Sequence, residues 1–172
     1  MPTLNEFGVL DAIPNRFAGL TVRDLDEAEV HSLVRLALKV LEHRHRRGQP
    51  LSNPEETRDY LRLTLADRKA EVFGCVFLDN RHRVRGVEEL FHGTIDGASV
   101  HPRVVVQRAL EVNAAALILF HNHPSGVAEP SRADELLTRR LKDALALVDV
   151  RVLDHFVVTA EDSVSFAERG LI

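Results

Sequence analysis

The segment HNHPSGVAEPSRAD, residues 121–134, carries the residue types of this chain that are best suited to chemistry. His121 and His123 are one residue apart, and on an extended segment such side chains point to the same side. Ser131 and Asp134 follow after a gap of seven residues, and at a helix start their spacing places both on the first turn. Two imidazoles and one carboxylate form a three-ligand set that suits a catalytic zinc ion with an open fourth position.

Each half of this segment also has a simpler interpretation. Two histidines in a loop can be hydrogen-bonded without binding a metal, and S-x-x-D is an ordinary N-terminal capping box. The occurrence of both features within one short segment favours a metal site. A structural zinc site would need four ligands, usually including cysteines, and Cys75 is the single cysteine. Cys75 lies in an apolar run, which predicts a core residue.

The elements around this segment predict a mixed α/β sandwich with helices flanking a central sheet. The apolar run 114–120 predicts a buried central strand that runs into His121 and is stopped by Pro124 and the Ser-Gly turn. Strand ends of this kind commonly carry the sites of α/β sheets. Periodicity and turn residues predict the following elements: helices 24–46, 54–66, 101–113 and 131–147, and strands 70–78, 84–94, 114–120, 150–159 and 163–166.

Composition limits the function classes. The 172 residues are 45% hydrophobic and 28% charged, as in ordinary globular proteins, and the net charge of −4 argues against a general nucleic-acid binder. There is no run of 18 apolar residues, which predicts no membrane span. The first residues lack a basic start followed by an apolar block, so we expect no secretory signal and a cytoplasmic location.

The pattern H-x-H, seven residues, then S-x-x-D resembles the JAMM signature of the JAB/MPN metalloprotease superfamily, and HNHPSG…EPSRAD resembles the bacterial RadC family. FHGTIDGASVHPR, ALEVNAAALILFHNHPSG, VDVRVLDHFVV and SFAERGLI extend the resemblance over residues 63–172. It implies a JAB/MPN domain at 66–172, a three-layer sandwich similar to the cytidine-deaminase fold. Residues 1–65 would then form an N-terminal helical extension.

The resemblance implies a zinc ion held by the three ligands of the signature, His121, His123 and Asp134. It also implies that Ser131 hydrogen-bonds the tetrahedral intermediate and that Glu71 matches the superfamily's upstream catalytic glutamate. From the residues alone, Glu71 is equally well a solvated carboxylate at a strand start. Glu88 and Glu89 on the adjacent strand are rivals, and only the family match selects Glu71.

The function implied is a zinc-dependent metallopeptidase or isopeptidase with an unknown protein or peptide substrate. A carboxylate would take a proton from water and pass it to the leaving amine, and a hydroxyl would stabilise the oxyanion. The alternative is an accessory factor of DNA repair or of a mobile element, with a non-hydrolytic or regulatory zinc site. Longer RadC-like chains carry a helix-hairpin-helix DNA-contact region with a G-x-G hairpin, and this sequence has no G-x-G. A homodimer is a further expectation.

Two other groups of residues have open interpretations. Asp154 and His155 lie on the strand 150–159, where His155 either orients a ligand histidine or packs as a hydrogen-bonded core imidazole. The basic stretch EHRHRRG, 42–48, either contacts phosphate or a partner or forms the solvated end of the first helix, where cations suit the helix dipole, and the second interpretation is favoured.

Overall fold

The computed structural model describes residues 21–44, 48–51, 54–65, 68–93 and 99–172. The chain divides into two compact units, Met1–Leu36 and Ala37–Ile172. The described part of the first unit contains the 3₁₀-helix η1 (Val22–Asp24) and the beginning of α1 (Glu27–Arg44). Most of the basic stretch 42–48 lies outside the residues whose side chains are described.

The helix predicted from residue 24 is two elements in the structure. Thr21 and Asp24 form a capping box, and it caps η1 and not the long helix. A second pair caps α1, because the Asp26 amide donates to Glu29 and the Glu29 amide donates to Asp26. The long helix therefore begins at Glu27, three residues later than its periodicity predicts.

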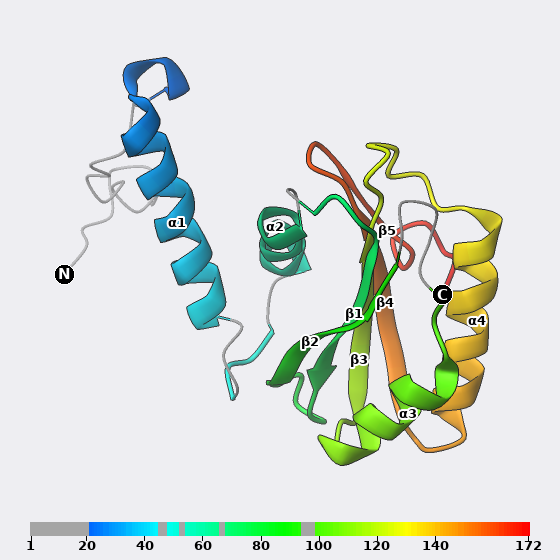
Figure 1. The fold of residues 1–172 in the computed structure, drawn as a ribbon. Coiled ribbons are helices and arrows are strands. Elements are labelled where there is room, and N and C mark those ends of the chain that lie inside the picture. Colours follow the sequence, from blue (N-terminus) through cyan, green and yellow to red (C-terminus); the bar gives the residue numbers. More distant parts are fainter. Residues whose placement is uncertain (1–20, 45–47, 52–53, 66–67, 94–98) are drawn as a thin grey trace, which may run out of the picture. The chain divides into compact units, whose positions relative to one another are not determined.

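The second unit has three layers, as predicted. A five-stranded mixed sheet lies between α2 on one face and α3 and α4 on the other (Figure 1). The strand order is β2-β1-β3-β4-β5, with β3 and β4 parallel and every other pair antiparallel. The elements are α2 (Pro54–Leu65), β1 (Val72–Leu78), β2 (Val84–His92), α3 (Pro102–Glu111), β3 (Ala116–Asn122), α4 (Arg132–Ala146), β4 (Arg151–Val158) and β5 (Ser163–Ser165).

Alternation along the central strands produces one hydrophobic cluster on each face of the sheet. On β1, Val72 and Val76 pack toward α2, while Phe73 and Cys75 pack toward α3 and α4. The predicted core position of Cys75 is confirmed, and burial raises the pKa of its thiol. Every residue of β1 and β3 is buried, as expected for central strands covered on both faces.

The same alternation decides where the first histidine of the motif lies. Leu117 and Leu119 of β3 belong to the cluster under α3 and α4, so His121, two residues further on, faces the same layer. The apolar run ends at residue 120, and β3 continues through Asn122, which pairs with Val158 of β4, as expected for a strand that runs into His121. His121 is therefore a strand residue, and His123 is the first residue beyond the strand.

The helix α2, which lies within the predicted N-terminal extension, packs on the sheet through Leu61 and Leu65. The predicted division between residues 65 and 66 stays a prediction. Among the described residues, no helix is both long enough and apolar enough to cross a membrane.

Candidate metal centre

His121 is held rigidly within the sheet. Its side chain is 1% exposed and stacks on Phe73 of β1, the residue directly opposite in the antiparallel pair. Its Nδ1 atom lies 2.8 Å from Nε2 of His155 on β4. With Nδ1 engaged in this way, Nε2 of His121 is the nitrogen that points to the other residues of the motif.

His123 is fixed by three contacts just beyond the strand. Its amide donates to the carbonyl of Val158 at 2.9 Å, and its own carbonyl accepts from Gly126 in the Pro-Ser-Gly turn. Gly126 has a φ of 82°, a conformation that glycine adopts without strain. The Nδ1–H of His123 donates to the carbonyl of Val127 at 2.7 Å, which leaves Nε2 as the nitrogen that faces His121 and Asp134.

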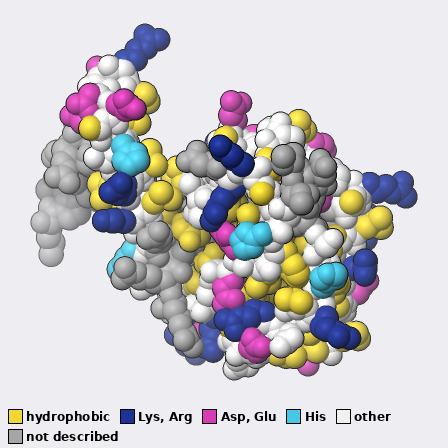
Figure 2. All heavy atoms as spheres, viewed as in Figure 1, with side chains coloured by type: hydrophobic (Ala, Val, Ile, Leu, Met, Phe, Trp, Pro, Cys, Tyr) yellow, Lys and Arg dark blue, Asp and Glu magenta, His cyan; other side chains and the backbone are white. Residues whose placement is uncertain are grey.

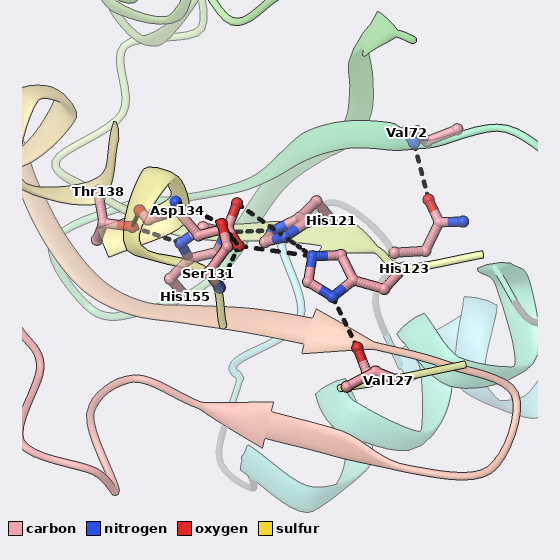
Figure 3. Close-up of polar contacts among 9 residues, drawn as sticks. Val72, His121, His123, Val127, Ser131, Asp134, Thr138 and His155 are labelled. Atoms are coloured by element: carbon pink, nitrogen blue, oxygen red, sulfur yellow. Dashed lines mark hydrogen bonds and ion pairs between the residues drawn. The ribbon is translucent and has the colours of Figure 1, made fainter. Parts of the chain in front are cut away.

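Asp134 enters the site from the first turn of α4. Its Oδ2 accepts the amide of Ser131 at 2.7 Å and the hydroxyl of Ser131 at 2.6 Å, and Ser131 caps the Asp134 amide in return. The capping-box interpretation is therefore correct. The same carboxylate also faces the histidines, with Oδ1 3.4 Å from Nε2 of His121 and Oδ2 3.5 Å from Nε2 of His123 (Figure 3).

The three side chains fit a metal ion. The two Nε2 atoms are 2.9 Å apart, and one ligand atom from each of the three residues lies within 4.8 Å of the others. Zinc bonds of about 2.0 Å at tetrahedral angles would separate ligand atoms by about 3.3 Å, so small rotations of the rings would admit the ion. Among the described residues, this is the one group of three or more potential ligands that meets this criterion.

A buried chain of hydrogen bonds supports His121. Thr138 Oγ1 lies 2.6 Å from Nδ1 of His155 and donates to the main-chain carbonyl of Asp134 at 2.6 Å. If Nε2 of His121 is a ligand, its Nδ1–H donates to His155, and His155 donates to Thr138. Every donor in this series of hydrogen bonds then has an acceptor, which fixes one tautomer for the imidazole rings of His121 and His155.

These contacts resolve the interpretation of His155 that the sequence left open. His155 is fully buried, packs against Phe73 and Phe166, and also orients a candidate ligand histidine. Burial, followed by the nearby charge of His121, holds the pKa of His155 well below its ordinary value. A neutral imidazole is the form that this hydrogen-bond chain requires. Sequence reasoning missed Thr138, although its position four residues after Asp134 places it on the same face of α4.

The electrostatics of the site favour a cation. Burial alone would raise the pKa of the Asp134 carboxyl, but hydrogen bonds from His121, His123 and Ser131 outweigh it and hold the pKa well below its usual range. The hydrogen bond to Asp134 raises the pKa of His123, against the opposing effect of burial, and the charge of Glu71 adds to the rise. The site therefore attracts a proton where a metal ion would bind.

Glu71 lies immediately before β1, on the face of the sheet that carries the histidines. Glu71 precedes Phe73, the partner of His121, by two residues and so falls on the same face by strand alternation, and its charge acts on His123. No side-chain hydrogen bond or ion pair engages Glu71 within the described part of the chain. Its rivals are occupied: Glu88 is bound by Arg108 at 2.6 and 2.8 Å, and Glu89 is bound by Arg68 and His92. Glu71 remains the predicted base on these grounds.

Ser131 is near the site, but its hydroxyl donates to Asp134 in this structure. The oxyanion role implied by the resemblance would require that hydroxyl to turn from Asp134 toward a substrate, and this role stays a prediction.

The exposed fraction of the side chain rises from 1% for His121 to 14% for Asp134 and 17% for His123. The centre is therefore closed on the sheet side and open toward the turn that follows β3.

The fold and the site together define an α/β protein with a candidate divalent-metal centre at the end of its central strand. The chain belongs to the RadC-like JAB domain family, whose model matches residues 51–171.

Curated relatives agree with this assignment. A UPF0758 protein of Thioalkalivibrio sulfidiphilus is 62% identical over 145 residues, which cover 84% of this chain and 65% of the relative. UPF0758 proteins of Halorhodospira halophila and Stutzerimonas stutzeri are each 54% identical, and the matches cover 96% and 97% of this chain and 74% and 77% of the relatives. The chain thus spans slightly less than two thirds of the length of the first relative. These names state no activity.

Proposed function

We propose that this protein is a zinc-dependent hydrolase that cleaves amide or isopeptide bonds. The proposal rests on one observation: Nε2 of His121, Nε2 of His123 and the carboxylate of Asp134 lie close enough together to bind one ion. Each histidine is also held by a hydrogen bond through its other nitrogen, Nδ1. Two imidazoles and one carboxylate, with an open side, are the ligand set of a catalytic zinc site. When bound there, zinc would supply a Lewis acid that acidifies water and polarises a carbonyl group.

The residues around the ligands have the chemistry that amide hydrolysis needs. Glu71 lies on the ligand face and has no competing partner among the described residues, so its carboxylate is available to accept a proton from water and deliver it to the leaving amine. Ser131 has a hydroxyl at the open side of the site, where it would donate to the developing oxyanion. The His155–Thr138 chain holds His121 in one tautomer and so keeps Nε2 directed at the ligand position.

The alternative is an accessory role in DNA repair or in a mobile element, with zinc bound but no hydrolysis. On the face of the molecule shown in Figure 2, side chains of both charge signs lie next to one another and form no broad basic surface in the described part. A nucleic-acid backbone is usually met by a basic surface. Together with the net charge of −4, the mixed charges on this face favour a hydrolase that acts on protein over a direct DNA-binding role.

The experiment that tests the proposal compares zinc-loaded and metal-free protein on a library of fluorogenic peptides and on isopeptide-linked conjugates. We expect cleavage only in the loaded form, and we expect Glu71→Gln to abolish cleavage while the protein still binds one zinc ion per chain. Asp79→Ala, at the far end of β1, is the control and should remain active. A protein that binds zinc and cleaves none of these substrates would contradict the hydrolase and support the accessory role.

A further inference from the structure

Asn122 separates the two candidate ligand histidines in the sequence and is not used in the function proposed above. Its side chain is buried, with 3% of the residue exposed. Oδ1 accepts the amide of Val72 at 2.7 Å, and Nδ2 donates to the carbonyl of Ala70 at 3.2 Å. These two residues are the immediate neighbours of Glu71, so one amide side chain holds the backbone on both sides of the candidate base.

This double contact replaces missing sheet pairing. The ladder between β1 and β3 ends at the pair Phe73–His121, and no backbone pairing continues to Glu71. The carboxamide of Asn122 offers one acceptor and one donor, as a peptide group does, and satisfies two backbone groups that would otherwise be unpaired. On the other side, the Glu71 carbonyl accepts the amide of Gly93 at 2.8 Å. Glu71 is therefore held like a strand residue although it lies outside β1.

We propose that Asn122 is a positioning residue that fixes Glu71 relative to the metal ligands His121 and His123. This inference rests on the function proposed above, because it assigns Asn122 a role through Glu71. The physical basis is that Asn122 shares its backbone with both ligands and its side chain with both neighbours of the base. A shift of β3 that moved the ligands would therefore move Glu71 with them. A carboxylate acting on water beside a metal needs placement of this kind, since small displacements of a catalytic group reduce rates strongly.

Asn is suited to this position because of its shape and its two functional ends. Asp would keep an oxygen for the Val72 amide but would lose the donor to Ala70. Leu has a similar shape and would fill the space, but it would make neither hydrogen bond and would leave both backbone groups unpaired. These differences allow the two contacts to be tested separately without leaving a cavity.

The first test measures amide hydrogen exchange by NMR in the full chain, without any substrate. Asn122→Leu should reduce the protection of the Val72 amide by about tenfold or more, the equivalent of one lost hydrogen bond, while Asn122→Asp should keep it within about threefold of the wild type. Asp79→Ala is the matched control, because it also removes a side chain that holds backbone groups. Asp79 accepts the amides of Arg81 and Arg83 at the opposite end of β1, so its loss should leave the protection of the Val72 amide unchanged. Unchanged Val72 protection in Asn122→Leu would overturn the proposal.

The second test asks whether Asn122 acts through Glu71. The protein is loaded with Co²⁺ as a spectroscopic substitute for zinc, and the absorption spectrum is followed as a function of pH. Asn122→Leu should bind one Co²⁺ per chain, since all three ligands remain. The pH midpoint of the change in its absorption spectrum should move in the same direction as in Glu71→Gln. In the Glu71→Gln background, Asn122→Leu should cause no further shift.

The outcomes separate the two proposals. Equal shifts from Asn122→Leu with and without Glu71 would show that Asn122 does not act through Glu71, and would overturn the positioning role. A protein that binds Co²⁺ but shows no response to Glu71→Gln would contradict the catalytic role of Glu71 and with it the positioning role, whatever the exchange data show. A protein that fails to cleave peptides but gives the expected exchange and spectra would contradict the proposed function alone.

Discussion

His155 hydrogen-bonds through Nε2 to Nδ1 of His121 at 2.8 Å, and its other nitrogen lies 2.6 Å from the hydroxyl of Thr138. This buried contact joins β4 and α4 to the first candidate ligand. It gives the imidazole of His121 a fixed orientation before any metal binds.

Replacing His155 should therefore weaken metal binding although His155 is not a ligand. We expect His155→Phe, which keeps an aromatic ring but no nitrogen, to lower zinc affinity by about 10- to 100-fold, as loss of such supporting contacts generally does. Thr138→Val removes only the far end of the chain and should have a smaller effect. Competition with a chromophoric chelator measures both. Wild-type affinity in His155→Phe would show that His121 is oriented by other means.

Asp134 has two roles that substitutions can separate. Asp134→Asn retains an oxygen for the Ser131 amide but loses the ligand charge, so helix capping should persist while zinc binding falls below detection in the same chelator assay. Ser131→Ala removes the cap on the Asp134 amide and should cost about 1 kcal/mol of stability in urea unfolding. Ser131→Ala should still bind one zinc ion per chain. Loss of zinc in Ser131→Ala and retention in Asp134→Asn would reverse these assignments.

Zinc affinity should fall on acidification, and the decline should begin at a higher pH than an ordinary histidine would cause. The hydrogen bond to Asp134 raises the pKa of His123 above its ordinary 6.5, so below that raised pKa zinc must displace a proton. Each displaced proton lowers the apparent affinity by about tenfold per pH unit. Asp134 stays ionised in this range, because its own pKa is held low.

Isothermal titration at a series of pH values checks this dependence. Glu71→Gln is an informative comparison, because the charge of Glu71 contributes to the raised pKa of His123. Without that charge, the pKa of His123 should fall and the loss of affinity should begin at a lower pH. An affinity that does not change from pH 8 to pH 5 would contradict the assignment of His123 as a ligand.

Much of this site could be predicted from the sequence because its ligands lie within one short segment. Strand alternation and the first turn of a helix are local rules, and they predicted that His121, His123 and Asp134 share one side. For His155 the sequence left two roles open, and the link through Thr138 to Asp134 could not be predicted, because it joins residues of different elements. The choice of Glu71 over Glu88 depended on the family match, since the engagement of Glu88 by Arg108 is a tertiary contact. The apolar run alone did not give the last residue of β3, because pairing with β4 extends the strand to Asn122.

The stability of the sheet that carries the site should depend on the absence of a side chain at Gly74. A Cβ atom at this position of β1 would overlap the ring of Phe120 and the carbonyl oxygen of Glu88. We expect Gly74→Ala to destabilise the protein by about 3 kcal/mol, as overpacking of a core does. Gly86→Ala in β2 is the control, because its Cβ would meet only the end of the Glu88 side chain, at 3.4 Å. Thermal unfolding measures both, and equal melting temperatures would contradict the close packing of β1 on β3.

We propose that one zinc ion is held jointly by His121, His123 and Asp134. Diffraction from crystals grown with zinc, recorded on both sides of the zinc absorption edge, would locate the ion. We expect one anomalous peak about 2.0 to 2.2 Å from both Nε2 atoms and from an oxygen of Asp134. A fully loaded crystal with no peak among these three side chains, or with zinc bound elsewhere on the chain, would contradict it.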